Sequence, residues 1–165
     1  MATHISHSAA ETEALGETWG RIATSGLVVG LSGELGAGKT QLVKGFARGL
    51  GITQRVHSPT FNLVNVYCGG RLTLFHLDFY RLDQREQILG AGLEEYFHPA
   101  GVTVIEWAER WFGKVWGRRS EVRELQSPIT SHQSPIARLP ERFRRVLIED
   151  LGETARRITY EDFGH

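Results

Sequence analysis

The segment that most constrains this chain is residues 33–40, which read GELGAGKT. It fits the pattern G-x-x-x-x-G-K-[ST], in which glycines allow backbone N–H groups to turn toward phosphate oxygens. The apolar run LVVGLSG, starting at Leu27, precedes it, and the amphipathic run TQLVKGFARGLG follows Lys39. This order predicts a buried strand, a phosphate-binding loop and a helix whose N-terminus attracts anions.

The loop predicts a division of chemical roles. Lys39 is expected to reach the β- and γ-phosphates of a nucleotide, and the Thr40 hydroxyl to bind Mg²⁺. An acidic side chain near the metal is also required, and Asp78 and Glu106 each lie where a predicted strand ends. Strand ends of this kind form the ligand-binding edge of α/β sheets. From the residues alone, either carboxylate could hold Mg²⁺, orient an attacking water, or cap a turn.

Periodicity and turn residues predict the other elements. In chain order they are a helix over about 9–24 opened by Ser8 and Glu11, strands over 61–67 and 71–78 in a hairpin around Gly69 and Gly70, helical pieces within 84–97 broken at Gly90 and Gly92, a strand over 101–107, and strands over 146–150 and 155–160 around Gly152.

Several other side chains have two readings. Ser58 and Thr60 bracket Pro59, and such a hydroxyl-rich segment is either a switch near the γ-phosphate or a plain turn. Trp107, beside Glu106, is either a core residue or a lid over the site. His57 and His76 lack the spacing of metal ligands, so we assign both a structural role.

Composition excludes several classes of protein. The chain of 165 residues carries 19 basic and 19 acidic residues, so no global charge favours a polyanion. Its one cysteine, Cys68, cannot form an internal disulfide. We see no signal peptide, and no apolar run is long enough to cross a membrane. These features predict a cytoplasmic protein.

Residues 108–142 differ from the rest of the chain. They are rich in charge and contain the tetrapeptide QSPI at 126–129 and again at 133–136. Pro, Ser, Gln and Thr bury little apolar surface, which predicts a flexible insertion at about 111–138. Trp111, Trp116, Arg118 and Arg119 suggest contacts with RNA, but we favour an inert, solvated insertion.

The segments GELGAGKT, HSPTFNLVNVY, LFHLDFYRL, GLEEYF and VTVIEWAER occur in this order and at close spacing. In this combination the chain resembles the TsaE (YjeE) family, the ATPase of bacterial tRNA threonylcarbamoyladenosine biosynthesis. The resemblance covers about residues 8–110 and resumes weakly at 139–160. It implies an α/β fold, namely a P-loop NTPase three-layer sandwich with a mixed central sheet, in a single domain over residues 1–165.

The resemblance also implies the cofactors ATP and Mg²⁺. Lys39, Asp78 and Glu106 match functional positions, and Glu106 with Thr40 is favoured as the metal pair. Ser58 and Thr60 match a switch-like segment, Thr12 lies where the family contacts adenosine, and Arg156 matches a late arginine near the nucleotide. The implied nucleotide-binding residues are Thr12, Gly33, Leu35, Gly36, Ala37, Gly38, Lys39, Thr40, Gln41, Ser58, Thr60 and Arg156.

In function, the resemblance implies a subunit required for N6-threonylcarbamoylation of adenosine 37 in tRNAs that read ANN codons. It implies a TsaD–TsaB complex as partner, tRNA contact only through that complex, and weak ATP hydrolysis by the isolated chain. The residues by themselves leave two other functions open: a P-loop small-molecule kinase and a nucleotide-sensing adaptor without turnover. GTP hydrolysis is disfavoured because an N-K-x-D segment is absent.

Overall fold

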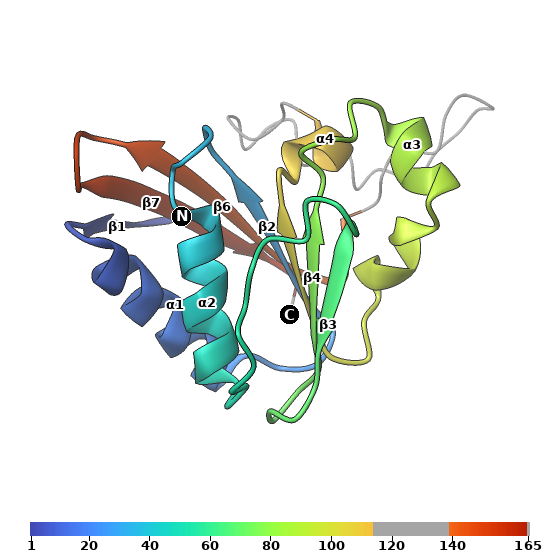
Figure 1. The fold of residues 1–165 in the computed structure, drawn as a ribbon, viewed down its shortest axis with the longest axis horizontal. Helices are drawn as coiled ribbons and strands as arrows, with labels where there is room; N and C mark the ends of the chain where they lie inside the picture. The colour runs from blue at the N-terminus through green and yellow to red at the C-terminus, as the bar shows by residue number, and fades with distance from the viewer. Residues whose placement is uncertain (114–138, 165) are drawn as a thin grey trace.

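The computed structural model describes residues 1–113 and 139–164, which form one seven-stranded sheet flanked by helices (Figure 1). The strand order is β1-β7-β6-β2-β5-β4-β3. The elements are, in chain order, β1 (Ala2–Ser6), α1 (Ala9–Ile22), β2 (Leu27–Ser32), α2 (Lys39–Gly49), β3 (Val64–Tyr67), β4 (Leu74–Asp78), α3 (Arg85–Gly90), the 3₁₀ helix η1 (Leu93–Phe97), β5 (Val102–Glu106), α4 (Glu109–Phe112), β6 (Arg142–Asp150) and β7 (Arg156–Phe163).

The sheet is mixed, with its parallel part at the centre. Strand β2 pairs in parallel with β5 and β6, and β4 pairs in parallel with β5. Strands β3, β7 and β1 add antiparallel pairings toward the two edges. The central strands read as continuous apolar runs because both of their faces are covered. All residues of β5 are buried.

Two apolar cores lie on opposite faces of the sheet. One joins α1 and α2 to the sheet through residues such as Trp19, Phe46 and Val104. The other joins α3, η1 and α4 to the sheet through residues such as Ile88 and Ile105. Helix, sheet and helix therefore form three layers, which confirms the predicted α/β class and mixed sheet.

Glycines bring α1 and α2 into backbone contact. A Cβ atom at Gly16 would lie 2.2 Å from the carbonyl oxygen of Leu42, and one at Gly45 would lie 1.9 Å from that of Glu13. Any side chain at these positions would force the helices apart. Since α2 begins at the phosphate-binding loop, this packing fixes the loop relative to α1.

Most predicted elements are confirmed within a few residues. The helix predicted over 9–24 is α1, and the Ser8 Oγ caps it by accepting the Glu11 N–H at 3.1 Å. The predicted hairpin is β3 with β4. The helical pieces within 84–97 are α3 and η1. The two C-terminal strands form an antiparallel hairpin that is longer than predicted.

The strand predicted over 61–67 is wrong in its first half. Residues 61–63 belong to a turn closed by a 2.8 Å hydrogen bond from the Leu63 N–H to the Pro59 carbonyl. Leu63 has a φ of 63°, and Phe61 is 82% exposed. The alternation of apolar residues at 61–63 therefore does not indicate a strand here, because these residues form the turn, and the strand begins only at Val64.

Two further differences concern the segments beyond the recognised motifs. Strand β1 was not predicted, and it pairs with β7 at the edge of the sheet. The insertion predicted from 111 starts too early, because Trp111 and Phe112 are buried against Phe97 and Phe143. Burial also removes Trp111 as an RNA-stacking side chain. The remainder of the predicted insertion, with Trp116, Arg118 and Arg119, lies outside the described residues.

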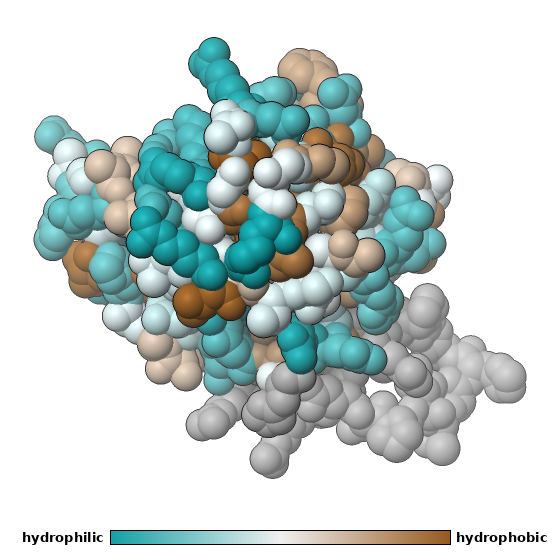
Figure 2. Space-filling model, turned by 90° about the horizontal axis from the view of Figure 1, so that it is seen from below, coloured by the Kyte–Doolittle hydropathy of each residue, from teal (hydrophilic) through white to brown (hydrophobic). Residues whose placement is uncertain are grey.

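The face of the molecule seen from below carries both apolar and hydrophilic residues (Figure 2). Figure 2 shows, from below, small groups of apolar residues separated by hydrophilic ones. Within the residues that the structure describes, none of the helices has the length and apolar character needed to cross a bilayer.

Candidate functional site

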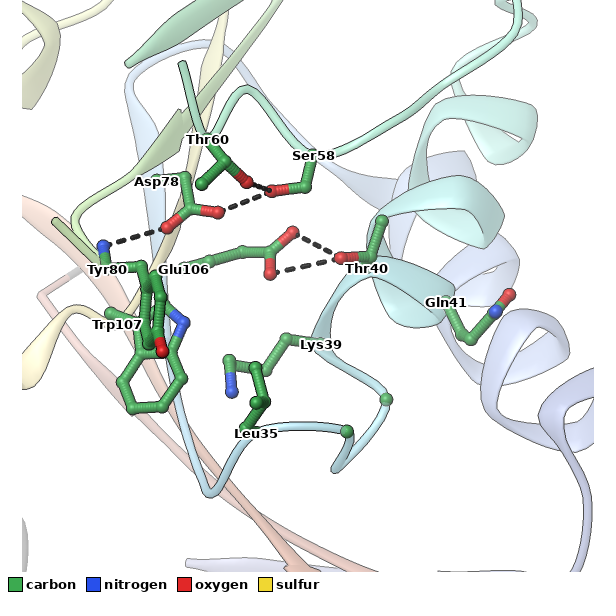
Figure 3. A pocket seen from close by; sticks show the side chains of 12 residues that line it. Leu35, Lys39, Thr40, Gln41, Ser58, Thr60, Asp78, Tyr80, Glu106 and Trp107 are labelled. Carbon is green, nitrogen blue, oxygen red and sulfur yellow. Dashed lines mark hydrogen bonds between the residues drawn. The ribbon is translucent and has the colours of Figure 1, made fainter. Parts of the chain in front are cut away.

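A cavity of about 410 Å³ opens where the loop after β2 faces the ends of β4 and β5. Figure 3 shows side chains from the loop, from α2 and from both strand ends pointing into it. The lining residues are Leu35, Gly36, Gly38, Lys39, Thr40, Gln41, Ser58, Thr60, Asp78, Tyr80, Glu106 and Trp107. Ten of these twelve are predicted site residues; Tyr80 was not predicted, and Trp107 had been left open between core and lid.

The loop takes its shape from glycines. Gly33 has a φ of 143°, and a Cβ atom there would lie 2.3 Å from the carbonyl oxygen of Ile148 on β6. Gly38, the residue before α2, has a φ of 103°. Left-handed backbone of this kind is open to glycine at little cost. The loop therefore passes close to β6 and delivers α2 with its N–H groups facing the cavity.

Lys39 is held at the back of the cavity. Its Nζ donates hydrogen bonds to the carbonyl oxygens of Gly33 at 2.6 Å and Glu34 at 2.9 Å. The same Nζ lies 3.9 Å from the centre of the Trp107 ring. Burial lowers the pKa of Lys39, while nearby carboxylates, Glu106 foremost, oppose that shift. A buried ammonium in this position is suited to an anionic ligand.

Glu106 reaches across the cavity to Thr40, as Figure 3 shows. The Thr40 hydroxyl lies 2.9 Å from Oε1 and 3.1 Å from Oε2 of Glu106. Glu106 is only 3% exposed. The structure thus pairs the hydroxyl and the carboxylate that were predicted as the metal pair, although they are 66 residues apart in the sequence.

Asp78 has different partners from Glu106. Its Oδ2 accepts a hydrogen bond from the Ser58 hydroxyl, which also lies 3.0 Å from that of Thr60. Its Oδ1 accepts the Tyr80 N–H at 2.8 Å. Asp78 therefore ties the segment around Pro59 to the end of β4. Of the two predicted readings, the structure shows the turn, which begins at Thr60, and the hydroxyls of Ser58 and Thr60 line the cavity. The switch stays a prediction.

A second cavity of about 360 Å³ adjoins the first and shares Gly36, Gly38 and Gln41 with it. Its lining residues are Ser8, Ala9, Thr12, Gly36, Ala37, Gly38, Gln41, Glu153, Thr154 and Arg156. The start of α1 and the β6–β7 turn therefore meet beside the loop. Arg156 joins the loop to the end of β6, since its Nε donates to the Ala37 carbonyl at 3.1 Å and its Nη1 to Asp150 at 3.1 Å.

The predicted site residues thus fall into two adjoining groups. Thr12, Ala37 and Arg156 line the second cavity, whereas the acidic residues and Lys39 line the first. Gly33 lines neither and contributes its carbonyl to Lys39. Thr12 is 2% exposed, and its hydroxyl lies 2.8 Å from that of Ser6.

His76 is the clearest omission of the sequence-based prediction. Its assigned structural role agrees with its complete burial, but its Nε2 also lies 2.8 Å from Oε1 of Glu106. The signal was its place two residues before Asp78, since alternate residues of a strand share a face. Glu109, also unpredicted, is half-buried near Lys39, and burial raises its pKa.

Comparison with known proteins gives a consistent result. A family model described as "Threonylcarbamoyl adenosine biosynthesis protein TsaE" matches residues 6–134, which is more than half of the chain. The protein named tRNA threonylcarbamoyladenosine biosynthesis protein TsaE in Bacillus subtilis (strain 168) is 37% identical over 155 residues, covering 94% of this chain and 82% of that relative.

The protein of the same name in Treponema pallidum (strain Nichols) is 50% identical over 106 residues, covering 64% of this chain and 78% of the relative. The crystal structure of Bacillus subtilis YdiB matches with a TM-score of 0.68 and 33% identity, covering 96% of this chain and 83% of that one. The fold, the loop and these likenesses agree, and this chain belongs to the TsaE family.

Proposed function

We propose that this chain is an ATP-binding and ATP-hydrolysing subunit required for N6-threonylcarbamoylation of adenosine 37 in tRNAs that read ANN codons. The observation that carries the proposal is the contact of Thr40 with Glu106 at the mouth of a glycine-rich loop, with the Lys39 ammonium behind it. A hydroxyl, a carboxylate and an ammonium in this arrangement are the groups that phosphoryl-transfer sites use. The relatives' names supply the pathway.

In this proposal the nucleotide spans both cavities. The triphosphate lies along the loop, where Leu35 to Thr40 present backbone N–H groups and Lys39 neutralises the terminal phosphates. The adenosine occupies the second cavity, between the start of α1 and the β6–β7 turn. Gln41 and the loop glycines line both cavities, which supports one continuous site.

The residues also fit Mg²⁺. This ion prefers hard oxygen ligands and is commonly held by few protein groups together with phosphate oxygens. Thr40 and Glu106 provide such oxygens, and Asp78 provides another beside them. Within residues 1–113 and 139–164, no cluster of three His, Cys, Asp or Glu side chains could hold a metal by itself. When bound, Mg²⁺ would neutralise charge on the β- and γ-phosphates.

The two carboxylates then have separate tasks. We assign Glu106, with Thr40, to the metal. We assign Asp78 to holding the segment of Ser58 and Thr60 at the γ-phosphate side, because its hydrogen bonds tie that segment to β4. In this proposal Asp78 also orients an attacking water. Lys39 stabilises negative charge that accumulates on the transferred phosphoryl group.

We further propose that a TsaD–TsaB complex completes this site and that tRNA is reached through that complex. Leu35, which lines the cavity, is 75% exposed, and Phe61, which follows the lining residue Thr60 in the sequence, is 82% exposed. A partner that covers them would exclude water from the phosphates, and activators supplied in trans act in this way. The lone cysteine is compatible with the cytoplasm, where we place the protein.

The first test is nucleotide binding by Lys39→Ala, with Lys44→Ala as the matched control. Lys44 is half-buried on the same helix and lines neither cavity. We expect Lys39→Ala to weaken ATP binding by about 30-fold or more in calorimetry, since loss of a buried charged partner costs about 2 kcal/mol or more. Equal affinities for the two variants would contradict the proposed phosphate site.

The second test concerns the pathway. ATP turnover by the pure chain is expected to rise when TsaD and TsaB are added, and depletion of the protein in cells is expected to remove threonylcarbamoyladenosine from tRNA. Unchanged turnover together with normal tRNA nucleosides would refute the proposed role. A phosphorylated metabolite in mass spectrometry would indicate a kinase instead, and binding without turnover under all conditions would indicate an adaptor.

A further inference from the structure

The imidazole of His76 contacts the carboxylate of Glu106. His76 is on β4, 0% exposed, and its Nε2 is 2.8 Å from Oε1 of Glu106 on the neighbouring strand β5. The register pairs Asp78 with Glu106 and His76 with Val104. His76 and Asp78 therefore share one face of β4. The Glu106 side chain, which is longer than that of Asp78, contacts the His76 ring and also lines the cavity.

The partners of the ring define its tautomer. A carboxylate oxygen accepts hydrogen bonds, so the hydrogen is on Nε2. Nδ1 is buried and, among the described residues, has no hydrogen-bond partner. A buried polar ring with one unsatisfied nitrogen is a poor choice for packing alone. The one polar contact of the His76 ring in the described part of the chain is with Glu106, which indicates that the role of the ring is to bind this carboxylate.

The contact restricts where the carboxylate can turn. A glutamate has three side-chain torsions, and the Thr40 hydroxyl alone contacts both oxygens without selecting one. The hydrogen bond from His76 anchors Oε1, so that Oε2 has only the Thr40 hydroxyl as a hydrogen-bond partner among the described residues. Asp78 needs no such support from β4, because Ser58 and the Tyr80 N–H already hold its two oxygens.

We propose that His76 is a positioning residue that donates from Nε2 to Glu106 and thereby fixes the carboxylate toward Thr40. The inference rests on the proposed ATPase function, which it deepens. Partners of ligating or catalytic side chains typically contribute about 10- to 100-fold to activity. Because ATP is held mainly by the loop backbone, the effect is on kcat more than on KM.

The test compares His76→Gln with His76→Asn, two amides of similar polarity. The Gln side-chain nitrogen comes near the position of Nε2, whereas the shorter Asn places its nitrogen near Nδ1. With TsaD and TsaB present, we expect His76→Asn to lower kcat about 10-fold or more at nearly unchanged KM for ATP. His76→Gln is expected to recover most of that loss, whereas a role in packing alone would give no such rescue.

Nuclear magnetic resonance of ¹⁵N-labelled histidine provides a readout independent of turnover. In the wild-type protein at a fixed alkaline pH, the His76 ring, assigned by its loss in His76→Gln, is expected to carry its hydrogen on Nε2. A hydrogen on Nδ1, or equal kcat for the Asn and Gln variants when both fold, would overturn the inference. If His76→Asn does not fold, the tautomer of the wild-type ring decides.

The two proposals fail in different ways. If the wild-type protein does not hydrolyse ATP even with its partners, the proposed function fails, while the tautomer still reports on the His76–Glu106 contact. If wild-type turnover depends on Glu106 but not on which amide replaces His76, only the positioning role is lost.

Discussion

In two regions of this protein, charged residues lie opposite one another on neighbouring strands. The charges attract one another in the first region and repel one another in the second. In the β6–β7 hairpin, directly opposite residues carry opposite charges, as in Arg144 with Asp162 and Arg145 with Glu161. At the cavity, Asp78 and Glu106 are also directly opposite, on β4 and β5, but both are acidic. Opposite charges in such positions stabilise a sheet, and like charges destabilise it.

Each of these charged residues has an oppositely charged partner on the neighbouring strand of the same hairpin. Further pairs, Asp150 with Arg156 and Glu149 with Arg157, repeat the same pattern near the turn. The cavity carboxylates, 4% and 3% exposed, instead rely on Thr40, Ser58 and His76 as hydrogen-bond donors and on the nearby Lys39 ammonium. The hairpin charges therefore stabilise the fold, whereas the cavity charges are tolerated by the fold and, in the proposed function, act on the ligand.

The largest effect is expected from Glu106→Gln, which keeps the shape and removes the charge. Turnover with partners present is expected to fall roughly 100-fold, the order of loss for a key electrostatic group in an active site. Thermal stability is expected to stay the same or rise, since repulsion from Asp78 is relieved. A fall in stability together with full activity would reverse our assignment of this carboxylate to function.

A buried pair of the hairpin is expected to affect folding instead. The side chains of Arg145 and Glu161 are 8% and 10% exposed, whereas Asp162 is 56% exposed. We expect Glu161→Ala to cost about 2 kcal/mol in urea unfolding, because it leaves a buried arginine less well compensated. The matched variant Asp162→Ala is expected to cost less than about 1 kcal/mol. Equal costs would show that burial does not distinguish these pairs.

Asp78→Asn sharpens the comparison within the cavity. We expect turnover to fall about 10-fold, less than for Glu106→Gln, because the amide retains an acceptor for the Tyr80 N–H and the change acts on positioning. Steady-state ATPase assays on both variants, at matched ATP and Mg²⁺, measure the difference. A larger loss for Asp78→Asn would move the metal role from Glu106 to Asp78.

The smallest effect concerns Glu109, whose pKa is raised above its ordinary value of 4.5 by burial, with Lys39 opposing the shift. The native protein binds this proton more tightly than the unfolded chain, so the contribution is present below pH 4.5 and is lost as pH rises through the raised pKa. Glu109→Gln lacks this loss. Its stability relative to wild type is expected to grow with pH across that window.

Urea unfolding at several pH values measures this difference, with the exposed Glu94→Gln as control. A constant difference between Glu109→Gln and wild type would mean that the carboxyl is not perturbed in the folded protein. Such a result would place Glu109 with the exposed charges of the hairpin, such as Asp162, and not with the buried charges of the cavity.

The sequence by itself determined the loop, the flanking strand and helix, and most of the residues that line the first cavity. Glycines at 33, 36 and 38 permit the positive φ angles of the loop, and strands ending in Asp78 and Glu106 follow from short apolar runs. These features depend on neighbours a few positions away in the chain. They were therefore predicted correctly, apart from residues 61–63, where a turn replaces the expected strand.

Only the tertiary structure decided which distant residues meet. Strand β1 depends on pairing with β7 at the other end of the chain, and Trp111 is buried because Phe97 and η1 provide a surface for it. The contact of His76 with Glu106 joins residues 30 positions apart. Local periodicity contains no information on such partners, because the free energy that selects them comes from burial and hydrogen bonding between separate elements.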